Sequence, residues 1–156
     1  MKTILVTLAL TACISLVMPQ DKSAELSQIQ DKLVRTVTEQ MPGWMHKEVT
    51  PVQGSRDVVI DQWTLDNKAL SITIIRFRSE EEAAKSIQQF AADMKAHKEI
   101  PAGSDEQYSL AAANTSIVFR KGEFQVYIHT RSTDTGDEKE LTRVVSRLTV
   151  NSIAGH

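Results

Sequence analysis

The sequence predicts an α+β fold in which two strand–strand–helix units form a four-stranded antiparallel sheet, with their helices packed on one face and a further helix at the N-terminus. Alternating apolar residues flank two short turns, Asp66-Asn67 and Lys121-Gly122, and this pattern predicts two hairpins. Each hairpin is followed by a capping box and an apolar stripe with helical spacing. A shift that places Trp63 on Ile117 also aligns the rest of the first unit with the second, which supports two similar units.

The composition is that of an ordinary globular domain. The chain has 156 residues, of which 41% are hydrophobic and 24% are charged, so a core can form within one domain. A formal net charge of −2 and an aromatic content of 5% argue against a basic or base-stacking surface. We therefore expect no nucleic-acid partner.

The first 18 residues are typical of an export signal. Lys2 precedes an apolar run that ends at Met18, and Pro19 opens a polar stretch. The run is shorter than the roughly 20 residues that a membrane-spanning helix needs. We assign residues 1–19 to a signal peptide or lipoprotein leader and residues 21–156 to a single α+β domain. The protein is then expected to be exported to the periplasm, the cell envelope or the medium.

Two ways of processing this leader remain open. Leu10-Thr-Ala-Cys13 resembles the lipobox of bacterial lipoproteins, which implies lipidation of the Cys13 thiol. The short apolar stretch before Cys13 and the apolar residues after it favour cleavage between Cys13 and Ala24 without a lipid. In either case a membrane is contacted only through the leader or through a lipid on Cys13. Cys13 is the only cysteine, so a mature chain that lacks it has no disulfide and no thiol ligand.

The first half of the domain is expected to begin with a helix. Leu26, Ile29, Leu33 and Val37 recur at helical spacing within residues 21–41, and Pro42-Gly43 ends the pattern. Residues 42–56 contain two prolines and two glycines, which predicts a loop. The first hairpin follows over residues 57–65 and 68–78, with Trp63 opposite Leu70 and Val59 opposite Ile74.

The remaining elements follow in order along the chain. Ser79 and Glu82 form a capping box for a helix that ends near Lys98. Residues 98–114 are expected to be a long connection, with a helical turn over Tyr108–Ala113 as an option. In the second hairpin Phe119 is expected to face Phe124 and Ile117 to face Val126. A second capping box, Thr135-Gly-Asp-Glu138, then opens the last helix, whose apolar stripe is Leu141, Val144, Val145 and Leu148.

Strand alternation divides the second hairpin into two faces. Ile117, Phe119, Phe124, Val126 and Ile128 share the core face, and Gln125, Tyr127, His129 and Arg131 point the other way with Val118. The N-terminal helix has two open placements. It covers this mixed outer face, or it packs beside the other helices.

Three segments together resemble a pattern that recurs in uncharacterised exported bacterial domains. They are Asp61-Gln-Trp63, residues 71–83 and residues 119–128. The resemblance extends over roughly residues 57–150 and lies mostly at structural positions. It implies a two-layer α+β fold and brings no catalytic residue or cofactor with it.

His129 is the best single candidate for chemistry. It lies on a strand with Tyr127 and Arg131 on the same face, and a general base requires a rigid support with polar neighbours. The simpler interpretation is a half-exposed strand histidine. His46, His97, His129 and His156 are scattered without metal-ligand spacing, so no metal site or cofactor is predicted.

Three further features bear on a site. Trp44 and His46 lie in the 42–56 loop, where ligand-binding residues often occur. Asp61 falls on the core-facing row opposite Ile72, where a lone carboxylate would be costly. A functional acid explains this position, but a one-residue change of register or an edge position explains it more simply. Four arginines are candidates for a basic patch, namely Arg76, Arg78, Arg120 and Arg131.

These observations predict an exported, non-enzymatic binding or interaction domain of the bacterial cell envelope. Its partner would be a protein or a small ligand, contacted by the outer sheet face and the 42–56 loop through Tyr127, His129, Arg131, Trp44 and His46. The alternative is a small hydrolase or lyase with His129 as general base, which requires a pocket in which His129 meets a carboxylate. A structural envelope component is a third possibility. No catalytic constellation or nucleotide-binding motif occurs in the sequence.

Overall fold

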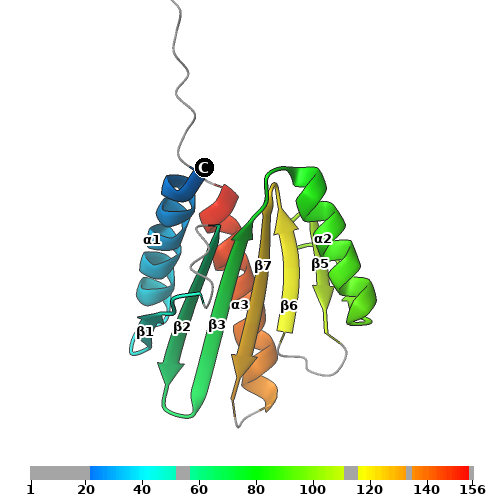
Figure 1. Ribbon diagram of the computed structural model, residues 1–156. Coiled ribbons are helices and arrows are strands. Elements are labelled where there is room, and N and C mark those ends of the chain that lie inside the picture. Colours follow the sequence, from blue (N-terminus) through cyan, green and yellow to red (C-terminus); the bar gives the residue numbers. More distant parts are fainter. Residues whose placement is uncertain (1–21, 52–56, 111–115, 133–134, 155–156) are drawn as a thin grey trace, which may run out of the picture.

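Seven strands form one antiparallel sheet in the order β1-β2-β3-β7-β6-β5-β4 (Figure 1). The computed structural model describes residues 22–51, 57–110, 116–132 and 135–154. The elements follow the chain as α1 (Lys22–Gln40), β1 (Met45–Glu48), β2 (Val58–Leu65), β3 (Lys68–Arg76), α2 (Glu80–Asp93), β4 (His97–Lys98), β5 (Glu106–Ser109), β6 (Ser116–Lys121), β7 (Phe124–Arg131) and α3 (Thr135–Ala154). The predicted α+β class is confirmed, although the sheet has seven strands rather than four.

Two of the three additional strands, β1 and β5, lie in segments that were predicted to be loops, whereas β4 lies where the preceding helix was predicted to end. β1 falls within residues 42–56 and pairs with β2, while β4 and β5 fall within residues 98–114 or directly before them. These strands contain two to four residues, too few to show an alternating pattern. The optional helical turn after Tyr108 is wrong, because Tyr108 and Ser109 lie in β5. Residues 111–113 fall outside the described part of the chain.

The inner face of the sheet carries the main core. Strands β3 and β7 pass in front of α3 in Figure 1, and α1 packs beside α3 and against β2. The buried core residues of α1 are Leu26, Ile29, Leu33 and Val37, and Met41 directly after the helix joins them. They meet the inner rows of the four long strands, which include Trp63, Ile72, Phe119, Val126 and Ile128. The predicted core face of the second hairpin is therefore confirmed.

Helix α2 lies on the opposite, outer face of the sheet. Its buried residues Ile87 and Ala91 cluster with Val118 of β6 and Tyr108 of β5, and Phe90 packs edge-on against Tyr127. The prediction that both unit helices share one face is wrong. Two helices already fill the inner face, and the apolar outer side of β5–β7 requires its own cover. Of the two placements left open for the N-terminal helix, α1 adopts the one beside α3.

The two hairpins differ in how well their register was predicted. β2 and β3 pair as expected, with Trp63 opposite Leu70 and Val59 opposite Ile74. In the second hairpin Lys121 lies opposite Phe124, so that Phe119 faces Val126 and Ile117 faces Ile128. The turn is therefore Gly122-Glu123, and the expected pairs are displaced by two residues. A displacement of two leaves every side chain on its predicted face.

Capping contacts fix the start of α2. The Ser79 hydroxyl accepts a hydrogen bond of 3.2 Å from the Glu82 amide, as predicted. The Glu82 carboxylate accepts from the amide of Arg78 at 3.3 Å instead of the Ser79 amide. For the second predicted box, the side chains of residues 135–137 lie outside the described part, while Glu138 accepts from the Ser132 amide at 2.5 Å. No helix in the described ranges is long and apolar enough to cross a membrane.

A double-mutant cycle tests the outer-face position of α2. Ile87→Ala is expected to cost about 2–5 kcal/mol of unfolding free energy, because the side chain is fully buried. Combined with Val118→Ala, it should show a coupling energy of about 0.5–3 kcal/mol in urea unfolding, because the two residues share a cluster. The matched pair Ile87→Ala and Ile117→Ala should be additive, since Ile117 belongs to the inner core. Coupling to Ile117 instead of Val118 would contradict the assignment.

Candidate functional site

A groove of about 550 Å³ lies between α3 and the part of the sheet that β5 and β6 form. We call it the α3–β5 groove and define it by its lining residues, Glu99, Ile100, Ala102, Gln107, Ile117, Arg143, Ser146 and Arg147. It lies on the inner face, where α3 packs on β6 and β7. Its volume falls within the usual range for small-molecule sites.

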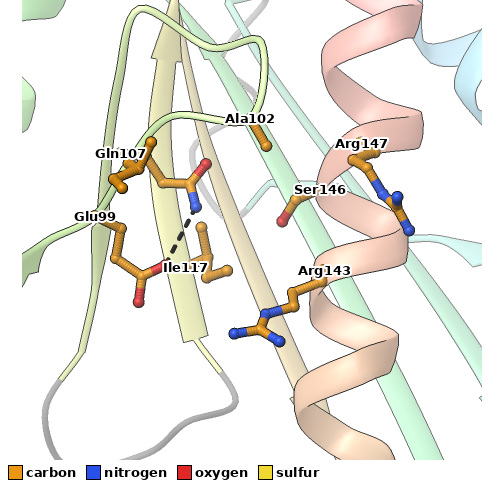
Figure 2. A pocket seen from close by; sticks show the side chains of 8 residues that line it. Glu99, Ala102, Gln107, Ile117, Arg143, Ser146 and Arg147 are labelled. Atoms are coloured by element: carbon orange, nitrogen blue, oxygen red, sulfur yellow. Dashed lines mark hydrogen bonds between the residues drawn. The ribbon is translucent and has the colours of Figure 1, made fainter.

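One wall of the groove is basic. Arg143 and Arg147 are exposed and lie four residues apart on α3. Figure 2 shows Arg143 extending across the groove toward β6, whereas Arg147 points to the other side of the helix. Neither arginine forms an ion pair with another residue in the described ranges. The guanidinium of Arg143 is therefore available to an anion that enters the groove.

The floor combines apolar and polar groups. Ile117 of β6 and Gln107 of β5 are both buried, and Ser146 faces the groove from α3 (Figure 2). The Ser146 hydroxyl donates to the Thr142 carbonyl at 2.8 Å, which leaves its oxygen as an acceptor. The Gln107 amide makes long hydrogen bonds, donating to Glu99 at 3.4 Å and accepting from Ser104 at 3.5 Å. Such weak bonds are easily exchanged for bonds to a ligand.

The segment between β4 and β5 forms the opposite wall. It contributes Glu99, Ala102 and Ile100, whose side chain is 92% exposed. Gly103 brings this segment against α3, because its backbone has φ of +93° and an added Cβ would lie 3.2 Å from Val150. Only glycine adopts this conformation without strain. The close approach fixes the wall relative to the helix.

His129 and Arg131 do lie together, in a smaller hollow of about 300 Å³ on the outer face. Both residues are exposed, and Gln62, Thr64 and Ser71 contribute to the same hollow. The His129 Nδ1 is 2.7 Å from the Ser116 hydroxyl oxygen. In the described part of the chain, the ring thus meets a hydroxyl and no carboxylate.

Tyr127 does not line this hollow, because α2 packs over it. Its ring packs against Phe90, and its hydroxyl accepts a hydrogen bond from the Gln125 amide. Burial raises the pKa of Tyr127 above the usual tyrosine value, so the phenol is neutral at physiological pH. Tyr127 therefore belongs to the outer cluster under α2.

Trp44 and His46 lie at the β1 end of the molecule. Trp44 is half-buried against the inner core and borders a further hollow of about 370 Å³ with Leu65 and Leu141. The five residues predicted to contact a ligand are thus distributed over three places, and only His129 and Arg131 share a hollow.

His46 forms a polar cluster with the buried Asp61 and with Gln30. Asp61 is 1% exposed, and its Oδ1 lies 2.7 Å from Nε2 of His46. Gln30 of α1 donates to both carboxylate oxygens at 3.1 and 3.2 Å. The His46 ring also packs on Trp63, with ring centroids 4.9 Å apart. The cluster therefore joins α1, β1 and β2.

The simpler explanations offered for Asp61 are wrong. It faces Ile72 in the predicted register, and β2 is an interior strand that β1 covers. β1 was not predicted from the sequence, and neither was the contact of its His46 with the Asp61 carboxylate. Burial raises the pKa of Asp61, while the hydrogen bonds from His46 and Gln30 partly offset this effect. His46 and Gln30 therefore reduce the free-energy cost of burying the Asp61 carboxylate.

The predicted basic patch is not formed, because two of its four arginines pair with acidic residues. Arg76 contacts Glu25 at 2.7 Å and also pairs with Glu123, and its guanidinium lies 5.6 Å from the Phe124 ring centroid. Arg120 pairs with Asp105 at 3.1 Å. Acidic neighbours thus compensate two of the four arginines. Arg143 and Arg147, which the sequence analysis did not single out, retain their charge facing solvent.

Comparison of the chain with protein-family models, with curated proteins and with solved structures found no match. Among the residues that the structure describes, no group of three or more potential ligands is arranged to hold a metal ion. The site must therefore be judged from its own geometry.

His46→Ala tests the Asp61 cluster. It removes one partner of a buried carboxylate and is expected to cost about 1–3 kcal/mol of unfolding free energy at neutral pH. Lys47→Ala is the matched control, because Lys47 is exposed in the same strand, and it should change stability by no more than about 0.5 kcal/mol.

The pH dependence of this loss has a definite sign. A carboxyl with a raised folded-state pKa stabilises the fold below its ordinary pKa, and the contribution is lost as pH rises through the folded-state pKa. The His46 hydrogen bond lowers the pKa of Asp61, so its removal raises that pKa further. The cost of His46→Ala should therefore shrink as the pH falls toward about 4. A cost that is independent of pH in urea unfolding would contradict the role of the pair.

Proposed function

We propose that this protein is a non-enzymatic binding domain and that its ligand occupies the α3–β5 groove. The observation that carries the proposal is the guanidinium of Arg143, which extends over an apolar floor at Ile117 without an ion partner in the described ranges. A planar guanidinium binds carboxylates through two parallel hydrogen bonds. The ligand class that fits is a carboxylate joined to an aliphatic group.

The other lining residues support this class of ligand. Ile117, Ala102 and the exposed Ile100 offer apolar contact for an aliphatic group. Ser146 and Gln107 offer hydrogen bonds that orient a polar chain. A site with a mostly apolar lining and a few placed polar groups is the usual design of small-ligand pockets.

The alternative, a small hydrolase or lyase with His129 as general base, has less support. His129 has a hydroxyl partner in Ser116, but Ser116 does not line the outer-face hollow that His129 borders. A histidine base is usually oriented by a carboxylate, and none contacts this ring in the described ranges. A hydrolytic activity that His129→Ala abolishes would favour the alternative.

We also propose that the domain works in the bacterial cell envelope. The support is the leader-like pattern of residues 1–19, which lie outside the described part of the chain. Mass spectrometry of the protein made with its own leader tests this proposal. A mature chain that starts between Cys13 and Ala24, with or without a lipid on Cys13, is expected. An uncleaved chain would contradict export by this signal.

The groove is tested with N-acetyl-L-valyl-L-valine, a carboxylate with aliphatic side chains and no free amine. The full chain should bind this probe, and Arg143→Gln should weaken binding about tenfold in isothermal titration calorimetry, because a hydrogen bond to a charged group is lost. Arg78→Gln is the control, since Arg78 is exposed at the start of α2 and far from the groove lining. Absence of binding, or equal binding by the Arg143 variant, would contradict the proposed site.

A further inference from the structure

We infer that the α3–β5 groove selects a short peptide with both a free amino terminus and a free carboxyl terminus. This inference rests on the proposed function and adds the requirement for a positive charge on the ligand. It arises from Glu99, which the carboxylate-binding proposal does not use.

The two walls of the groove carry opposite charges that do not meet. Glu99 lies on the β4–β5 wall and Arg143 on α3, and both line the same cavity. Figure 2 shows their charged groups on opposite sides of the Ile117 side chain. In the described residues the two groups form no ion pair within 4 Å, although each is accessible. A carboxylate on one wall and a guanidinium on the other match the two ends of a zwitterion.

The backbone around Glu99 holds the acidic wall in place. The Glu99 amide donates to the Gln107 carbonyl at 2.9 Å. Gly103 locks the same segment against Val150 of α3. The backbone of the acidic wall therefore has a defined position relative to α3.

The groove chemistry between the two charges suits a peptide chain. Gln107 presents an amide that both donates and accepts, which is the pattern of a peptide bond. Ser146 adds an acceptor for a peptide N–H. Ile117 and Ala102 provide apolar contact for side chains. A free amino acid would leave most of the 550 Å³ unfilled, so a peptide of two or three residues is the better match.

The experiment compares free and N-acetylated forms of Val-Val and Val-Ala-Val by isothermal titration calorimetry at pH 6.5, where an α-amino group is protonated. For at least one of the two lengths, the full chain should bind the free peptide about tenfold more tightly than its acetylated form, as expected for a charge-assisted hydrogen bond. In Glu99→Gln this preference should disappear, so that the ratio of the two affinities falls to about one. Glutamine keeps an acceptor for Gln107, and the substitution at this exposed position is expected to leave the fold unchanged.

Each outcome separates this inference from the proposed function. Acetylated peptides that bind through Arg143, with no gain from the free amine at either length, would overturn the inference and leave the carboxylate site intact. A preference for the free amine that persists in Glu99→Gln would also overturn it. If no peptide binds in either form, both the inference and the proposed function are wrong.

Discussion

The structure depends on the fact that β6 and β7 are apolar on both faces. Ile117 and Val126 point inward while Val118 and Tyr127 point outward, so the centre of the sheet must be covered twice. Helices α1 and α3 cover the inner face, and α2 covers the outer face of the same strands. Three helices do not cover seven strands completely. The inner side of β5 and the outer side of β2–β3 stay open, and the two hollows that concern function lie there.

The two open regions differ in what their charges can do. On the outer face, Arg131 and His129 lie in a hollow that is also lined by polar side chains and by Trp63, Ala69 and Leu70. On the inner face, a guanidinium faces an apolar floor and a carboxylate stands on the opposite wall. The groove therefore offers a positive and a negative group to one ligand, whereas no carboxylate lines the outer hollow among the described residues. By contrast, the His46–Asp61–Gln30 cluster satisfies its own charge and borders none of the principal hollows, which indicates a structural role in holding β1.

Sequence alternation predicted the long strands and their faces, because each one contributes a continuous apolar row to a core. It could not predict β1, β4 and β5, whose short segments form strands only through pairing with a neighbour. Sequence alternation also could not predict which face of the sheet α2 covers, because an apolar stripe such as Ile87 and Ala91 can pack on either face. Asp61 was recognised as unusual, but its partner His46 comes from a strand that was not foreseen. Arg143 and Glu99 are far apart in the sequence, and only the fold brings them to one groove.

The central claim is that ligand binding occurs on the inner face, in the α3–β5 groove. Its most direct test is an NMR titration of the ¹⁵N-labelled full chain with free Val-Val and Val-Ala-Val. We predict that the amide shifts change mainly at Gln107, Ile117, Arg143, Ser146 and Arg147. Changes confined to the outer hollow, around Ser71, His129 and Arg131, would contradict the claim, as would a spectrum that neither peptide alters.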